Sequence, residues 1–165
     1  MKQAVYLIIW MGMLLAGSSC SHKAEKDVPM RTISVTVEPL RYFTEVIAGD
    51  KFKVVSMVPK GSSPETYDPT PQQLVSLGGS DAYLRIGYIG FEQIWMDKLA
   101  ANAPDMLIFD MSEGVDLIRE KEPDHGDHRH EGGVEPHIWN STQNAHIIAD
   151  NIYKALCELD TVNIS

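Results

Sequence analysis

The amino-acid sequence predicts an α/β fold, a parallel sheet with helices on both faces. Short runs of β-branched and apolar residues alternate with segments of helical apolar spacing from residue 32 onward. This rhythm is typical of a parallel sheet whose crossover helices cover both faces. The 165 residues suffice for one domain and little more. Since ligands bind at the carboxyl ends of parallel strands, the loops after Val58 and Ile86 are where a site is expected.

Each predicted element has its own pattern. Strands are expected at four short β-branched or apolar runs, residues 32–37, 52–58, 82–86 and 106–109, the last fully apolar. Helices are expected where apolar residues recur at helical spacing, over residues 40–47, 71–77, 91–99 and 145–156. The first of these helices carries its apolar residues at Leu40, Phe43, Val46 and Ile47.

Capping signals mark several helix ends. Thr70-Pro71 has the order of an N-cap followed by proline at the first helical position. Gly49-Asp50 and Gly78-Gly79 are expected to end the helices before them. Residues 140–143, Asn-Ser-Thr-Gln, resemble a capping box before the last helix.

The first twenty residues have the layout of a secretory signal. A positive start is followed by an apolar run over residues 4–15 and small residues before Cys20. The run is too short for a helix across a hydrocarbon core of about 30 Å. We expect a signal peptide at 1–19, lipidation of Cys20 as in a bacterial lipobox, and a polar tether at 20–31 containing His22. The alternative for Cys20 is an ordinary cysteine. Lipidation would leave Cys157 alone, which excludes an intramolecular disulfide.

The charge distribution excludes one class of partner. The formal net charge is −9, and no basic cluster exceeds two residues. Nucleic acid is therefore not an expected partner. An acidic balance suits a protein that meets cations, although most acidic domains are merely soluble.

The most concentrated set of ligand-type residues lies in a charged loop, residues 120–133. Three imidazoles and two carboxylates occur within residues 125–131. Such groups suit Zn²⁺ and related ions, and a loop without apolar period favours capture over a fixed structural site. The auxiliary metal ligands expected here are His125, Asp127, His128 and His130. The alternative is a solvated loop without metal.

Two further segments carry possible ligands. In Glu135-Pro136-His137-Ile138-Trp139, a rigid proline and a Trp flank an imidazole, which would pre-orient it for a metal, although such a histidine is often structural. In residues 62–71, three prolines fix a loop that carries the carboxylates Glu65 and Asp68. Both could be ordinary loop acids, with Asp68 assisting the turn.

Together these motifs resemble the zinc and manganese solute-binding proteins of ABC importers. S-P-E-T-Y-D-P-T-P at 63–71, G-Y-I-G-F-E at 87–92, the His-rich loop and E-P-H-I-W at 135–139 follow the family's P-H-x-Y-x-P-T-P, N-G-x-x-x-E, optional His-rich insert and D-P-H-x-W. The likeness covers roughly residues 32–160. It implies two α/β lobes joined by a long helix, with the metal between them and two histidine ligands from the first lobe.

The resemblance assigns ligands residue by residue. It places one metal ligand at His137 and another at Glu65, where the family usually has histidine. A carboxylate still binds Zn²⁺ or Mn²⁺, but it hardens the site and reduces the preference for zinc. Glu135 replaces the usual Asp and is expected to support His137 or its turn. His146 is expected to be a surface or core-edge histidine.

The same likeness sets the expected domain organisation. The third and fourth ligands have no counterpart in this chain. We therefore expect a single, amino-terminal lobe at 32–160, with the start of the linking helix at 141–158.

Three functions remain in view. The leading one is an exported, membrane-anchored lipoprotein, facing the periplasm or cell exterior, that delivers Zn²⁺ or Mn²⁺ to an ABC permease without catalysing a reaction. The alternative is a stand-alone metal buffer or surface interaction lipoprotein that acts through the His-rich loop. A metallohydrolase is disfavoured because no H-E-x-x-H or comparable paired-histidine helix is present.

Overall fold

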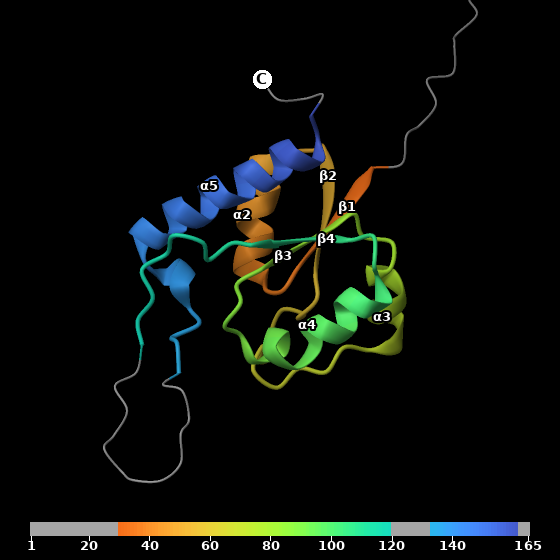
Figure 1. Ribbon diagram of the computed structural model, residues 1–165, viewed down its shortest axis with the longest axis horizontal. Helices are drawn as coiled ribbons and strands as arrows, with labels where there is room; N and C mark the ends of the chain where they lie inside the picture. The colour runs from red at the N-terminus through yellow and green to blue at the C-terminus, as the bar shows by residue number, and fades with distance from the viewer. Residues whose placement is uncertain (1–29, 120–132, 162–165) are drawn as a thin grey trace, which may run out of the picture.

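The fold is built on a four-stranded parallel sheet (Figure 1). The computed structural model describes residues 30–119 and 133–161. The strands are β1 (Arg31–Val35), β2 (Phe52–Ser56), β3 (Ala82–Arg85) and β4 (Leu107–Asp110), in the order β2-β1-β3-β4. In the register, Ile33 of β1 lies between Val54 of β2 and Ala82 of β3. All four predicted strands are therefore confirmed, with ends shifted by one or two residues.

Helices cover both faces of the sheet, as the sequence predicts. They are α2 (Glu38–Ala48), α3 (Pro71–Leu77), α4 (Gly90–Asn102), the short 3₁₀ helix η1 (Ile138–Asn140) and α5 (Thr142–Leu159). Helix α2 packs with α5, and α3 packs with α4 on the opposite side (Figure 1). The strand order explains this separation. The chain moves one way from β1 to β2 and the other way from β2 to β3 and β4, so right-handed crossovers put α2 on one face and α3 and α4 on the other.

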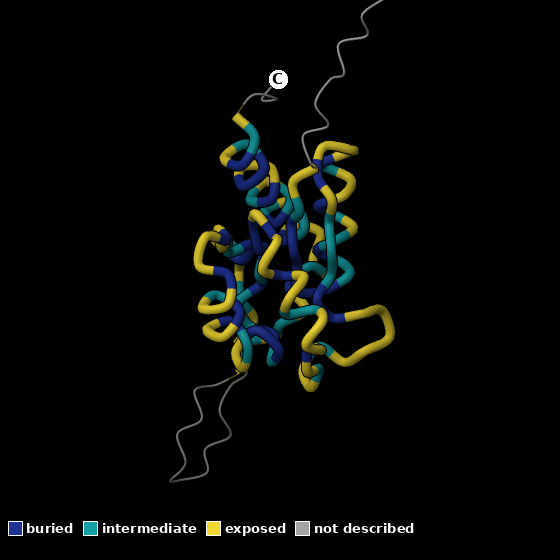
Figure 2. Tube along the Cα trace, turned by 90° about the vertical axis from the view of Figure 1, so that its right-hand side faces the viewer, coloured by how far each residue is buried: buried dark blue, intermediate teal, exposed yellow. Residues whose placement is uncertain are grey.

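The core lies along the two central strands and the helices against them. Figure 2 shows the buried positions gathered in the middle of the molecule and exposed residues on its outer turns. Fully buried side chains from the central strands include Ile33, Val35, Tyr83 and Leu84. The edge strand β4 differs, because Leu107 and Ile108 remain 47% and 39% exposed.

Two predicted helix starts have different outcomes. Thr70 caps α3 as expected: its hydroxyl accepts from the Gln73 N–H, and the Gln73 side chain accepts from the Thr70 N–H at 2.9 Å, completing a capping box. The box predicted at 140–143 is wrong. The N-cap of α5 is Ser141, whose hydroxyl accepts from the Asn144 N–H at 3.4 Å. The residue three positions after Ser141 is Asn, so the Glu or Gln of a capping box is absent from that position.

Several predictions fall outside the described residues. These are the signal at 1–19, lipidation of Cys20, the tether up to residue 29, and the auxiliary ligands His125, Asp127, His128 and His130. They stay predictions. Within the described part of the chain, no helix combines the length and apolar character needed to cross a membrane.

Candidate metal site

The loop after β2 is fixed to the start of α4. The Phe91 N–H donates to the Pro64 carbonyl at 2.9 Å, and the Gly90 N–H donates to Glu65 Oε2 at 2.9 Å. The Tyr67 and Phe91 rings lie 6.2 Å apart, centre to centre. Residues 64–67 therefore dock on the first turn of α4, which joins the two loops where the sequence predicts a site.

Glu65 presents one bound and one open carboxylate oxygen. The residue is exposed, Oε2 accepts from Gly90, and Oε1 has no hydrogen-bond partner among the described residues. Asp68, the other carboxylate of the loop, is exposed and forms no hydrogen bond or ion pair with that part of the chain. Of these two acids, Glu65 is therefore the one that the fold holds in a defined orientation.

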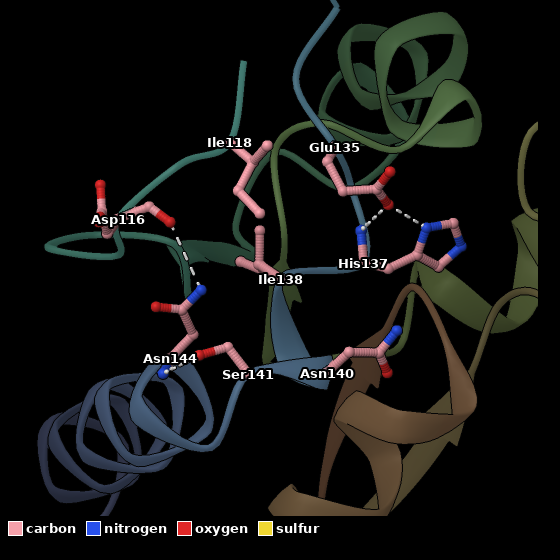
Figure 3. Close-up of a pocket in the computed structure, with 8 residues that line it drawn as sticks. All are labelled: Asp116, Ile118, Glu135, His137, Ile138, Asn140, Ser141 and Asn144. Atoms are coloured by element: carbon pink, nitrogen blue, oxygen red, sulfur yellow. Dashed lines mark hydrogen bonds and ion pairs between the residues drawn. The ribbon is translucent and has the colours of Figure 1, made fainter. Parts of the chain in front are cut away.

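His137 is oriented by its neighbour Glu135 (Figure 3). Glu135 Oε1 accepts from the His137 backbone N–H at 3.1 Å and also bonds the ring Nδ1. These bonds, the ring contact first, lower the pKa of the Glu135 carboxyl. The Trp139 ring stands nearly edge-on to the imidazole, with 5.3 Å between centres. With Nδ1 bound to a carboxylate, Nε2 is the ring nitrogen left to coordinate a ligand.

An open depression of about 310 Å³ lies beside His137 (Figure 3). It is lined by Asp116, Ile118, Glu135, His137, Ile138, Asn140, Ser141 and Asn144. The Glu135 N–H donates to the Ile118 carbonyl at 2.9 Å, next to an antiparallel bridge between Arg119 and Val134. Arg119 and Val134, which flank the His-rich loop at residues 120–133, are thus paired with each other close to His137.

The described residues do not assemble a complete metal centre. No group of three or more His, Cys, Asp or Glu side chains in them could hold a metal ion. Glu65 and His137 are joined to each other by neither a hydrogen bond nor an ion pair. His146 is exposed on α5, as expected of a surface histidine. A tetrahedral site would therefore need ligands beyond Glu65 and His137.

Comparison with known families settles the relationship that the motifs indicate. The family described as "ZnuA: Zinc-uptake complex component A periplasmic" matches residues 33–164, most of the chain. The chain belongs to the ZnuA family. Members are solute-binding proteins of metal ABC transporters, not enzymes.

Curated relatives in the ZnuA family carry different metals in their names. The chain is 30% identical to the manganese ABC transporter substrate-binding lipoprotein scaA of Streptococcus gordonii, over 99% of this chain and 54% of the relative. It is 31% identical to the iron ABC transporter substrate-binding lipoprotein MtsA of Streptococcus pyogenes serotype M1, over 92% of this chain and 48% of the relative. The chain thus spans about half the length of these relatives.

Solved structures give the same proportion. A crystal structure of ZnuA matches with a TM-score of 0.72 and 36% identity, over 82% of this chain and 49% of that one. A manganese-bound periplasmic metal-binding protein from Candidatus Liberibacter asiaticus matches with a TM-score of 0.70 and 26% identity, over 81% and 47% of the two chains. The predicted α/β class is confirmed, and the chain corresponds to one lobe of a ZnuA-like protein.

One ZnuA-family motif contains a polar residue to which the sequence assigns no role. Glu92, the last residue of G-Y-I-G-F-E, is 2% exposed. Its Oε1 accepts from the Ile86 N–H at 2.9 Å and from the Thr36 hydroxyl, and Oε2 accepts from the Gly87 N–H. Burial is the main cause that raises the pKa of this carboxyl. A Glu three positions into a helix usually faces solvent, so only its place in the motif pointed to it.

Proposed function

We propose that this chain captures a divalent transition metal, Zn²⁺ or Mn²⁺, outside the cytoplasm for delivery to an ABC permease. Membership in the ZnuA family and the metals named for its relatives support this substrate class. The chain spans about half of those relatives, so a complete site between two lobes would also use ligands from the second lobe of the family's fold. Helix α5 (Thr142–Leu159) would then form the start of the linking helix, which the sequence predicts over residues 141–158.

The observation that carries the proposal is the Glu135–His137 pair. Metal-binding histidines usually give their second ring nitrogen to a carboxylate or carbonyl, which fixes the tautomer and the ring direction. Glu135 bonds Nδ1 and the backbone N–H of the same residue, and Trp139 packs against the ring. His137 would therefore bind the ion through Nε2 without first ordering its side chain.

Glu65 is the second ligand in this proposal. The residue is exposed, Oε2 is held by Gly90, and Oε1 has no hydrogen-bond partner among the described residues. A carboxylate is a harder donor than imidazole, so replacing the family's usual histidine favours Mn²⁺ relative to Zn²⁺. Water or groups from another part would complete the coordination.

The proposed location is the outer face of a membrane, in the periplasm or at the cell exterior. Cys20 would carry the lipid, and residues 21–30 would tether the folded lobe. The names of relatives such as scaA include the word lipoprotein, which supports this placement. Mass spectrometry of the membrane-associated protein should find diacylglycerol on Cys20, and C20A should abolish it.

The central test is a metal titration of single variants. We expect H137A and E65A each to weaken Mn²⁺ and Zn²⁺ binding, with E65A acting more strongly on Mn²⁺. H146A is the matched control, because His146 is exposed on α5 and outside the site. Unchanged affinity in H137A, with loss of binding on deletion of residues 120–132, would contradict the proposal.

The same experiment tests the second candidate, a metal buffer that acts through the His-rich loop. The observation that favours it is the lack of a three-ligand group in the described residues. A buffer predicts that deleting residues 120–132 removes metal binding while H137A and E65A retain it. A capture protein predicts instead that H137A and E65A weaken metal binding, while deletion of residues 120–132 leaves binding at the Glu65–His137 site in place.

A further inference from the structure

The carboxylate of Glu92 lies at the point in the sheet, between β1 and β3, where the order of successive strands reverses. The chain leaves β1 toward β2, whereas β3 lies on the other side of β1, so the loops after β1 and β3 separate at this point. Thr36 follows β1, and Ile86 and Gly87 follow β3. All three donate to Glu92, which therefore joins the two loops and fixes the backbone that leads into α4.

The same turn ends at the contact with Glu65. Gly87 has φ +94°, a conformation that favours glycine, and the chain then enters α4 at Gly90. The N-cap residue Ile89 offers no side-chain acceptor, so the first N–H groups of α4 need partners from elsewhere. Glu65 Oε2 and the Pro64 carbonyl supply them at 2.9 Å each. The 64–65 segment thus caps α4 from outside.

We propose that Gly90 and Glu92 are positioning residues for Glu65. Glu92 holds the turn, and the turn places the Gly90 N–H so that it binds Oε2 and leaves Oε1 for the ion. The inference rests on the proposed function only in treating Glu65 as a ligand. The partial positive charge of a helix N-terminus also favours a carboxylate there, which gives a physical reason for Glu where the family usually has His.

Gly90 is required by the close approach of Glu65. A Cβ at this position would lie 2.6 Å from Glu65 Oε2 and 2.8 Å from the Glu65 carbonyl oxygen. Neither contact is possible without a shift, and the second involves backbone. G90A should therefore displace Glu65 while every proposed ligand keeps its identity. G79A is the matched control, because its Cβ would meet only Ser76 O at 3.6 Å, an ordinary contact.

The first experiment measures Mn²⁺ affinity in a double-mutant cycle. We expect G90A and E92Q to weaken Mn²⁺ binding about 10-fold to 100-fold, the range for residues that orient a ligand. In the E65A background both effects should disappear, and G79A should have none. L99A, a fully buried site on α4, controls for lost stability. Losses of equal size with and without Glu65, or losses matched by L99A, would overturn the positioning role.

The second experiment needs no metal. NMR hydrogen exchange at the Gly90 N–H should show loss of protection in E65A and also in E92Q, where only the supporting turn is changed. Unchanged protection in E92Q would overturn the positioning role. Unchanged Mn²⁺ affinity in E65A would instead refute Glu65 as a ligand, so the two proposals fail separately.

Discussion

A single oxygen of Glu135 accepts from two groups of His137, the backbone N–H at 3.1 Å and the ring Nδ1. Pro136 stands between the two residues and fixes φ, so the turn that brings them together needs little ordering. The backbone bond holds the turn, and the ring bond holds the imidazole. One carboxylate therefore determines both where His137 lies and which nitrogen it offers.

The first prediction concerns this support. E135A should weaken Mn²⁺ and Zn²⁺ binding about 10-fold to 100-fold, because the ring loses its fixed direction while Nε2 remains. E135Q should lose less, since its amide oxygen still accepts from the ring. Competition with a chromophoric chelator measures the affinities. D68N is the control, because Asp68 is an exposed carboxylate without a partner in the described residues. Equal losses in D68N and E135A would mean that only net charge matters.

The second prediction concerns the buried carboxylate of Glu92. Both of its oxygens accept hydrogen bonds, from Ile86 and Thr36 on one and from Gly87 on the other. E92Q puts an NH₂ group against one of these donors, which should lower the free energy of unfolding by about 1–3 kcal/mol. Urea denaturation followed by circular dichroism measures it. E158Q, at an exposed site on α5, should change it by less than about 0.5 kcal/mol. A change in the free energy of unfolding of less than about 0.5 kcal/mol in E92Q would contradict a stabilising role for the hydrogen bonds to Glu92.

The third prediction is the pH dependence of that difference. Burial raises the pKa of Glu92 above its ordinary value of 4.5, so on a rising pH scale the unfolded carboxyl loses its proton first. The unfolded state then binds fewer protons than the folded state, and the free energy of unfolding falls as pH rises. The E92Q variant has no titrating carboxyl at this position, so it lacks this fall in the free energy of unfolding. The stability advantage of the unsubstituted chain over E92Q should therefore shrink as the pH rises above about 4.5. Parallel stability curves would show that the folded carboxyl titrates normally.

Element order and type could be predicted because local patterns agree with the final packing. Residues 31–35 and 52–56 pair as parallel strands, and their β-branched side chains suit that position. The start of α3 after Thr70 follows from capping chemistry that is local in sequence. Such features need no knowledge of the tertiary structure.

Features that depend on tertiary contacts were not predictable. Val46 shares helical spacing with Leu40, yet it is 65% exposed because the buried stripe of α2 runs through Leu40, Thr44 and Ala48. The fully apolar run at residues 106–109 gives no sign that β4 is an edge strand with Leu107 exposed. Composition alone does not reveal how many neighbours a strand has.

The candidate site likewise combines residues that the sequence indicated with contacts that only the fold reveals. The motifs indicated His137 and Glu65, and the turn that contains Glu135 was expected. The bond from Gly90 to Glu65 spans 25 positions, and the bond from Thr36 to Glu92 spans 56. No spacing rule within one segment predicts such pairs, so these contacts emerge only from the fold.

The last prediction concerns whether α5 is part of the packed core of the lobe or is only loosely attached to it. Ile148 and Ile152 are fully buried, and α5 packs on α2. I152A should lower the free energy of unfolding by about 2–5 kcal/mol, the usual cost of truncating a buried isoleucine to alanine. H146A, on the same helix but exposed, should change it by less than about 0.5 kcal/mol. Chemical denaturation measures both.

Equal small effects in I152A and H146A would show that α5 is only loosely attached. A large effect in I152A alone would make α5 part of the core. The position of η1 would then be tied to the sheet, because η1 packs on α5 and begins directly after His137. In that case the proposed metal ligand His137, at the start of η1, and the helix expected to lead to a second lobe would move as one rigid unit.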